Sequence, residues 1–207
     1  MSNYLAIATV TEALKQLLQT EVGRDVPGVQ ITTVRPDTSS SNVSGACINI
    51  FLYQVTPNPA WRNADLRTRR PKGELYKHGQ AGLDLHYIFT FYGNEQELEP
   101  QQLMGSTIRI LVDQPLLTQA AIEESIAHTS IPVLENSTLA DQVQLVKFIP
   151  STITTEDLSR IWSIFFQVPY ALSFAYQATA VLIQGEKVGR AALPVRRRST
   201  AIALRFR

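Results

Sequence analysis

The stretch from Gly82 to Gly93 constrains the fold most, because no other part of the chain alternates so strictly between two sets of side chains. A period of two indicates a pleated strand. The second set mixes large apolar side chains with polar ones, which is typical of a strand half covered on that face and flanked by neighbours. The stretch therefore predicts the central strand of a sheet. One face carries Leu83, Leu85, Tyr87, Phe89 and Phe91, and the other carries Asp84, His86, Ile88, Thr90 and Tyr92.

The remaining pattern predicts an α/β domain. Apolar residues at helical spacing indicate docked amphipathic helices, and further alternation indicates strands. The strand predicted at 46–55 alternates much like the central strand, so we expect the two to pair. In chain order, the predicted elements are a helix over 4–22, strands over 29–34, 46–55 and 83–92, helices over 97–112 and 116–127, a strand over 143–149, a helix over 156–167 capped by Thr154 or Thr155, and a strand over 172–183.

Composition favours one large domain. The 207 residues are 44% hydrophobic, enough to bury a sizeable core. A formal net charge of +1 favours neither a dedicated nucleic-acid binder nor an acidic surface. The single cysteine, Cys47, excludes an internal disulfide, so a reducing compartment is the simpler interpretation. We expect no secretion signal at residues 1–10, and no membrane span at 161–185, where Pro169 and several polar residues interrupt an uncharged run.

A long connection at residues 56–81 carries most of the local positive charge. Connections of this length without periodicity are usually functional or disordered, so partner contact and a plain solvated loop both stay open. Trp61 favours contact, since arginine and tryptophan together are enriched where proteins meet. The basic loop, residues 62–77, contains Arg62, Arg67, Arg69, Arg70, Lys72 and Lys77 against Asp65 and Glu74.

The end of the sequence forms a second basic segment beyond Pro194. After the triplet Arg196–Arg198, residues 201–207 alternate again and place Ile202, Leu204 and Phe206 on one side. One interpretation is strand addition to an exposed sheet edge of a neighbouring subunit, which would satisfy the backbone of so short a segment. The other is a disordered basic terminus, because chain ends are commonly mobile.

Catalytic patterns are scarce. Asp84 and His86 share a strand face and suggest an orienting pair, but no nucleophile is identifiable by spacing, and a histidine bonded across the sheet is the more ordinary interpretation. The histidines at 78, 86 and 128 are too scattered for a metal motif, and the sequence contains no nucleotide-binding glycine pattern. We expect Cys47 to pack as a small apolar residue. The sequence thus predicts no cofactor.

An ordered series of motifs resembles one known family over roughly residues 5–185. The chain is similar to the tail-terminator, or cap, proteins of phage-tail-like extracellular contractile injection systems, whose N-terminal domain was long catalogued as a domain of unknown function. The motifs are Ile50–Asn58 (IFLYQVTPN), Trp61–Asn63 (WRN), Leu83–Tyr87 (LDLHY), Phe91–Gly93 (FYG), Leu103–Gly105 (LMG) and Pro169–Ser173 (PYALS).

The resemblance implies an α+β fold with a mixed, mainly antiparallel sheet flanked by helices, a tail-terminator-like domain at 1–190 and an extended basic arm at 191–207. It implies a sixfold ring of identical subunits at the distal end of the inner tube and sheath, which stops polymerisation and anchors the last sheath layer. Such a protein is made and assembled in the cytoplasm as part of a particle that is released or membrane-tethered.

The partners that the resemblance implies are further copies of the chain, the inner tube protein and the sheath protein. No reaction, nucleic acid or direct membrane insertion is implied. The alternative is a nucleic-acid-binding or enzymatic module that uses the basic loop, although a phosphate-tracking domain is normally more positive. The residues expected at interfaces are Trp61, Arg62, Asn63, Arg67, Arg69, Arg70, Arg196, Arg197, Arg198, Ile202, Leu204 and Phe206.

Overall fold

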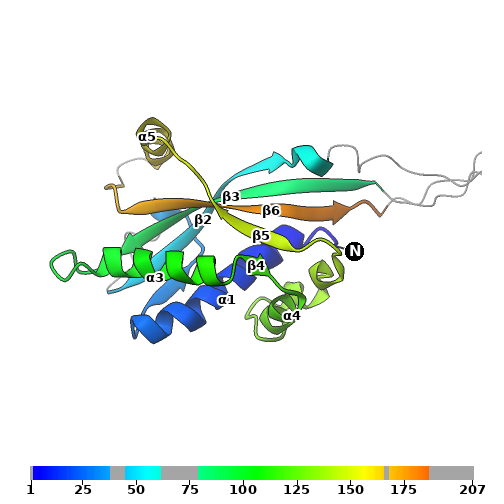
Figure 1. Cartoon of the computed structure of the whole chain (residues 1–207), viewed down its shortest axis with the longest axis horizontal. Coiled ribbons are helices and arrows are strands. Elements are labelled where there is room, and N and C mark those ends of the chain that lie inside the picture. The colour runs from blue at the N-terminus through cyan, green and yellow to red at the C-terminus, as the bar shows by residue number, and fades with distance from the viewer. Residues whose placement is uncertain (1, 38–44, 62–78, 166–167, 187–207) are drawn as a thin grey trace, which may run out of the picture.

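A computed structural model describes residues 2–37, 45–61, 79–165 and 168–186. Its centre is a six-stranded sheet in the order β1-β2-β3-β6-β5-β4 (Figure 1). Only β1 and β2 run parallel, so the sheet is mixed and mainly antiparallel, and the predicted α+β fold is confirmed. The elements are α1 Ala6–Asp25, β1 Gln30–Thr32, β2 Cys47–Pro57, β3 Gln80–Tyr92, α3 Glu99–Asp113, β4 Leu116–Leu117, α4 Gln119–Ala127, the 3₁₀ turns η2 Pro132–Asn136 and η3 Leu139–Asp141, β5 Val146–Pro150, α5 Thr155–Ser163 and β6 Ser173–Gln184.

The alternating strand predicted from the sequence is β3, and it lies in the middle of the sheet. It pairs antiparallel with β2 on one side and with β6 on the other. Phe89 lies opposite Ile50 and Phe174, and Ile88 lies opposite Phe51 and Ala175, so each face of the sheet keeps one set of side chains. The pairing predicted between β2 and the central strand is thus confirmed.

Helices α1, α3 and α4 lie on one face of the sheet and form the main core with it (Figure 1). We call this the helix face. The stripe of apolar residues along α1 is buried, with Val10, Leu14 and Leu18 fully inaccessible to solvent. They pack against the β3 set that includes Tyr87 and Phe89, both also at 0% exposure. The helix face therefore supplies most of the apolar burial that stabilises the domain.

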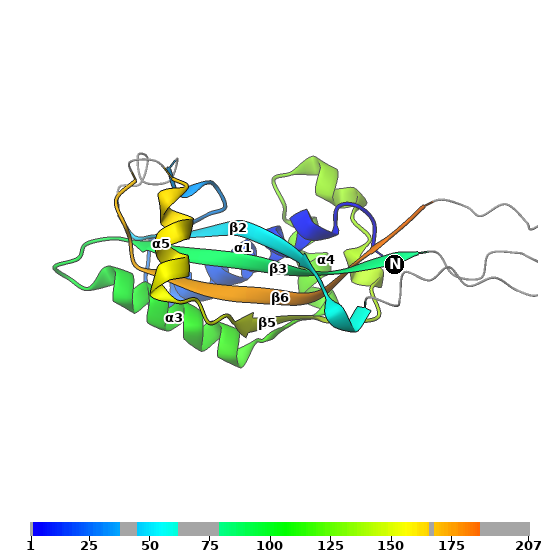
Figure 2. The ribbon, with the colours of Figure 1, turned by 90° about the horizontal axis from the view of Figure 1, so that it is seen from above.

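The opposite face of the sheet, the second face, carries one α-helix in the described part of the chain. Helix α5 crosses this face near one end of the sheet (Figure 2). Aromatic contacts attach it: the rings of Phe51 and Phe165 meet edge to face at 5.5 Å, and Trp162 meets Phe165 at 6.2 Å and Tyr170 at 5.5 Å. The predicted half-covered character of this face agrees with this arrangement.

Element boundaries differ from the sequence prediction by up to four residues, and two helices show the physical reasons. The helix predicted from 116 starts at Gln119, because the Thr118 hydroxyl accepts a hydrogen bond from the Ala121 amide and caps it there. The preceding Leu116 and Leu117 instead form β4, which pairs with β5. The helix predicted over 156–167 is capped by Thr154 as expected, but it ends at Ser163.

Candidate assembly interface

The basic loop leaves the sheet through a packed turn that ends at Trp61. A Cβ atom placed on Gly82 would lie 2.3 Å from the Trp61 Cβ, so the tryptophan sits directly against the backbone of β3. Only glycine leaves room for this contact. The Asn58 amide donates to the Gly82 carbonyl at 2.8 Å, and the Trp61 amide donates to the Asn58 carbonyl at 3.1 Å. The predicted interface residue Trp61 therefore anchors the start of the loop to the sheet.

The Asp84 side chain on β3 stabilises the same turn. Its Oδ1 accepts a hydrogen bond from the Asn58 side-chain amide at 2.7 Å and a longer one from the Ala180 amide at 3.4 Å. Ala180 has a φ of 63°, at a bulge where β6 has one residue more than β3 between neighbouring pairs. The carboxylate is 6% exposed and its contacts hold three chain segments together. Asp84 thus has a structural function at this position.

His86 does not form a catalytic pair with Asp84. Its Nε2 lies 2.9 Å from the Thr56 hydroxyl of β2, and its ring lies against Tyr53 at a centroid distance of 6.0 Å. The interpretation of a histidine hydrogen-bonded across the sheet is confirmed. Cys47 is fully buried, and burial raises the pKa of its thiol, which agrees with its prediction as a packed apolar residue.

The two long strands beside β3 differ at their outer edges. Near the C-terminal end of β6, other segments bond to its outer edge. The Leu182 amide donates to the Gln142 side chain at 3.0 Å, and the Gln184 amide donates to the Ser2 carbonyl at 3.0 Å. Within the described residues, β2 pairs with β1 only up to Asn49. Among the described residues, no strand pairs with the remaining outer edge from Ile50 to Pro57, and an edge of this kind can accept an added strand.

Both basic segments adjoin this end of the sheet. The Gly185 amide donates to the Gly79 carbonyl at 2.9 Å, so the chain enters β3 and leaves β6 side by side. Among the interface residues expected from the sequence, Trp61 is described by the structure. Those that lie outside the described residues are Arg62, Asn63, Arg67, Arg69, Arg70, Arg196, Arg197, Arg198, Ile202, Leu204 and Phe206.

The other end of β3 is acidic, a feature that the sequence analysis missed. Glu95, Glu97 and Glu99 follow the strand within seven residues, and no lysine or arginine occurs between Lys77 and Arg109. The Glu99 carboxylate accepts the Asn94 amide at 2.6 Å and fixes the turn, whereas the side chains of Glu95 and Glu97 form no ion pair within the described residues. A hollow of about 320 Å³ beside Glu95 has Tyr92, Pro100 and Leu172 among its walls. In the sequence, the long run without lysine or arginine could have indicated this acidic end.

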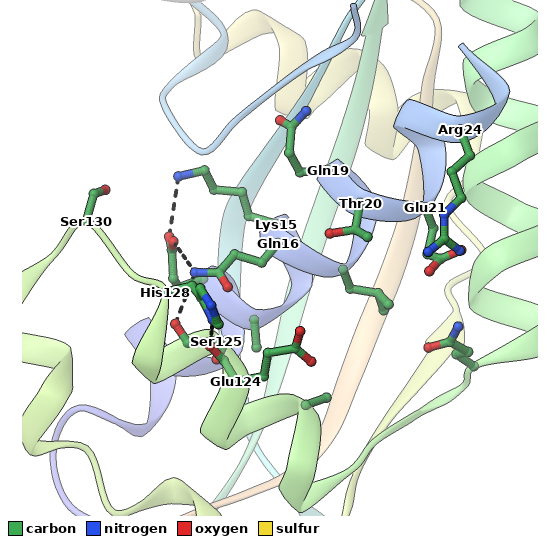
Figure 3. Close-up of a pocket in the computed structure, with 15 residues that line it drawn as sticks. Lys15, Gln16, Gln19, Thr20, Glu21, Arg24, Glu124, Ser125, His128 and Ser130 are labelled. Atoms are coloured by element: carbon green, nitrogen blue, oxygen red, sulfur yellow. Dashed lines mark hydrogen bonds and ion pairs between the residues drawn. The ribbon is translucent and has the colours of Figure 1, made fainter. Parts of the chain in front are cut away.

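An open groove of about 670 Å³ lies between α1 and α4 (Figure 3). The Glu12 carboxylate, at 7% exposure of its side chain, accepts a hydrogen bond from Gln16 at 3.0 Å and pairs with Lys15 at 3.5 Å. The same Gln16 amide nitrogen donates to the Ser125 carbonyl on α4. The His128 Nδ1 lies within hydrogen-bond distance of the Glu124 carbonyl, so the imidazole caps the C-terminal end of α4. These contacts hold α1 and α4 together and assemble no nucleophile with a base.

The described residues contain no group of three or more histidine, cysteine, aspartate or glutamate side chains placed to hold a metal ion. Within the same residues, no helix combines the length and the apolar character needed to cross a bilayer.

The sequence matches the family model described as the Pvc16 N-terminal domain over residues 9–197. The chain belongs to this family. Two solved structures resemble the chain over 96% and 93% of its length, at TM-scores of 0.59 and 0.58 and sequence identities of 19% and 22%. A comparison with curated proteins gave no match.

The first structure is titled as the sheath/tube terminator, in the extended state, of the extracellular contractile injection system PVC. The second is titled as the tube-terminating cap of the anti-feeding prophage. The domain spans 63% and 60% of those two chains. The resemblance to the cap family that the sequence motifs indicated is thereby confirmed, and the solved structures show that the fold is terminator-like.

Proposed function

We propose that this chain is the structural terminator of a contractile injection system. It assembles in the cytoplasm as a ring of six copies at the distal end of the inner tube and sheath, stops polymerisation and anchors the last sheath layer. The observation that carries the proposal is the terminator fold over nearly the whole chain. In the described residues, Trp61, Gly79 and Gly185, next to which the two basic segments continue, lie at one end of the sheet, which suits a subunit that contacts its neighbours at that end.

The alternative of a nucleic-acid-binding or enzymatic module using the basic loop has less support. Both solved structures are titled as terminators. Asp84 and His86, the two residues that suggested catalysis, instead make structural hydrogen bonds. Retention on immobilised nucleic acid that falls with added salt would favour that alternative.

The ring is tested by native mass spectrometry. Six copies of the 23.1 kDa chain give a particle of about 139 kDa. We expect this mass for the chain alone or after mixing with tube protein. A particle that stays monomeric or dimeric in both conditions would exclude the ring, and tubes that keep growing in the presence of the protein would exclude termination.

The arginines of the basic loop are proposed to contact a neighbouring subunit, the tube or the sheath. Replacing Arg62, Arg67, Arg69 and Arg70 by glutamate should reduce assembly and leave folding intact, since exposed charges contribute under about 1 kcal/mol each to the stability of a monomer. Electron microscopy of particles and the melting temperature of the isolated chain measure the two effects. Normal particles from the fourfold variant would contradict this role.

The second basic segment is proposed to add as a strand to a sheet edge of a neighbour, with Ile202, Leu204 and Phe206 facing inward. Removal of residues 195–207 should then give a folded chain that assembles poorly, because the added backbone hydrogen bonds are lost. The matched control replaces Arg196–Arg198 by alanine and keeps the alternating residues. Unchanged capping and sheath attachment after the deletion would show that the segment is dispensable.

A further inference from the structure

Helices α4 and α5 are a matched pair that the fold attaches in different ways. Each has 9 residues and begins after a threonine whose hydroxyl accepts a backbone amide, Thr118 for α4 and Thr154 for α5. Helices of this length are marginal in water by themselves, so each stays helical because it is docked on the rest of the domain. The docking contacts therefore decide whether a helix can open by itself.

Helix α4 is part of the main core. Its Ile122 side chain is 4% exposed and belongs to the apolar core of the helix face. The Ser125 carbonyl accepts a hydrogen bond from the Gln16 side chain of α1 at 3.0 Å. Detachment of α4 would open this core and break the hydrogen bond between the two helices. We therefore expect α4 to open only when the whole domain unfolds.

Helix α5 is attached to the described sheet by apolar contacts alone. Its hydrogen bonds are local, and no hydrogen bond or ion pair joins residues 155–163 to another described element. Trp162 supplies the buried side chain of the helix, and Phe165, just beyond it, contacts both Trp162 and the Phe51 ring of β2. Ile164, between these two aromatic residues, is exposed. Two aromatic side chains thus provide most of the attachment.

The packing beneath α5 is incomplete. A hollow of about 430 Å³ has Leu158 of the helix on one side and Ile88 and Ala175 of the sheet on the other. The Trp162 indole N–H is buried and has no hydrogen-bond partner in the structure. When α5 lifts from the sheet, water reaches this N–H, and the new hydrogen bond offsets part of the apolar contact that is lost. The closed position of α5 is therefore only weakly favoured over an open one.

We propose that α5 is a movable cover of the second face, which detaches together with Phe165 while the sheet and the helix face stay folded. In the closed position, shown in Figure 2, the helix lies across the sheet near one end. Detachment uncovers the Phe51 ring and widens the hollow over Ile88. This device goes beyond the proposed function, because it belongs to the isolated subunit and does not depend on the ring.

Native-state hydrogen exchange of the full chain in low concentrations of urea, measured by mass spectrometry, tests the cover. The amides of α5 should exchange at least about thirtyfold faster than those of α4. Their exchange should also depend little on urea, because a local opening exposes little surface. Equal exchange of the two helices, or the same dependence on urea for α5 as for β3, would overturn the proposal.

An alanine variant in α4 separates a movable cover from a helix that opens only with the domain. Ile122→Ala weakens the core in both the closed and the α5-open chain, so exchange of α1 and α4 should accelerate by about a hundredfold while that of α5 stays unchanged. Acceleration of α5 by the same factor would overturn the proposal. If the alanine variant does not fold, Ile122→Val gives the same comparison at about fivefold.

The matched variant at the docking contact is Phe165→Ala. It removes the ring contacts to Phe51 and Trp162, so exchange of the α5 amides should accelerate by about tenfold or more. Circular dichroism checks that the remainder of the chain is folded. Unchanged exchange of α5 in this variant would show that the aromatic contacts do not hold the helix closed, and would overturn the proposal while the terminator function stands.

Discussion

The two faces of the sheet differ in how completely the chain itself covers them. On the helix face, α1, α3 and α4 bury a continuous apolar core that includes Leu14, Leu103 and Phe89, each at 0% exposure. On the second face, α5 covers only one end. Three polar atoms on that side are buried without a hydrogen-bond partner in the described structure: the Thr90 hydroxyl, the Tyr92 hydroxyl and the Trp162 indole nitrogen. Such unpartnered atoms each cost about 1–3 kcal/mol.

This difference separates the residues that fold the subunit from those that remain for contact. Buried polar groups on the helix face find partners within the described residues, as the Tyr87 hydroxyl does with Thr11 at 2.8 Å. On the second face, Ile164 is 73% exposed and Tyr170 is 60% exposed, on the same side as the three buried polar atoms that lack a partner. We therefore expect substitutions on the helix face to change the stability of the monomer far more than comparable substitutions on the second face.

The largest effect is expected for Phe89→Ala on the helix face. Phe89 is fully buried and packs edge to face on Tyr176 at 5.6 Å, so its removal should lower the free energy of unfolding by about 3–5 kcal/mol. The matched variant on the other face is Phe51→Ala, where a half-buried ring should cost about 1–2 kcal/mol. Urea unfolding followed by circular dichroism measures both. Equal losses would contradict the division between the faces.

A smaller effect is expected for Trp162→Phe on the second face. The substitution removes apolar surface, and it also removes a buried indole N–H that has no partner. Because these contributions oppose each other, the free energy of unfolding should change by less than about 1 kcal/mol. Trp162→Ala serves as the reference, since it also opens a cavity and should cost clearly more. A loss for Trp162→Phe as large as that of the alanine variant would show that the indole is well satisfied.

Tyrosine titration distinguishes the faces at alkaline pH. Burial, with a smaller contribution from the neighbouring Cys47, raises the pKa of Tyr92 to about 12. A raised pKa means that the neutral form is favoured in the folded chain, so this stability is present below about pH 10 and is lost as the pH rises towards 12. Tyr92→Phe should make the alkaline decline shallower and remove one phenol from the ultraviolet difference titration. Burial raises the pKa of Tyr87 as well, so titration of Tyr87 before Tyr92 would contradict the comparison.

The smallest effect is expected at the α1–α3 contact near Asp25. Hydrogen bonds from Ser106 at 2.5 Å and from Arg109 at 2.7 Å hold the pKa of this carboxyl below its ordinary value of 3.8. Because the pKa is lowered, the stabilisation is present above about pH 4 and is lost as the pH falls through the folded value. Asp25→Asn should lower the urea midpoint slightly at neutral pH and not in strong acid. Asp113→Asn is the control, and an equal effect there would exclude a specific role for Asp25.

The sequence contained most of the fold because its strands alternate and its helices carry clear apolar stripes. Strand β3, its pairing with β2 and the Thr154 cap of α5 all followed from local patterns. Strand β4 did not, because a two-residue strand has no period of its own and depends on its pairing with β5. The early end of α5 at Ser163 also depends on tertiary context, since Phe165 turns onto Phe51 beyond the helix.

The candidate interface could be predicted only in part. The many arginines near a tryptophan indicated that the basic loop is an interface. The contact of Trp61 with Gly82, which the sequence did not predict, attaches the start of that loop to the sheet. The acidic stretch after β3 was missed because glutamates just before and at the start of a helix are ordinary in sequence terms. Their meaning depends on the length of β3, which places them at the far end of the sheet from the loop.

The coverage of the β6 edge by Ser2 has a consequence for synthesis on the ribosome. The first described residue, Ser2, bonds to the backbone of Leu182 and Gln184, so this edge of the sheet is closed by segments 180 residues apart in the sequence. Translation at about 5–20 residues per second separates these parts by roughly 10–40 s. During that interval β2 and β3 have emerged while the strand that completes their other side is still missing. The nascent chain therefore exposes an open strand edge that favours holding by chaperones until its last strand emerges.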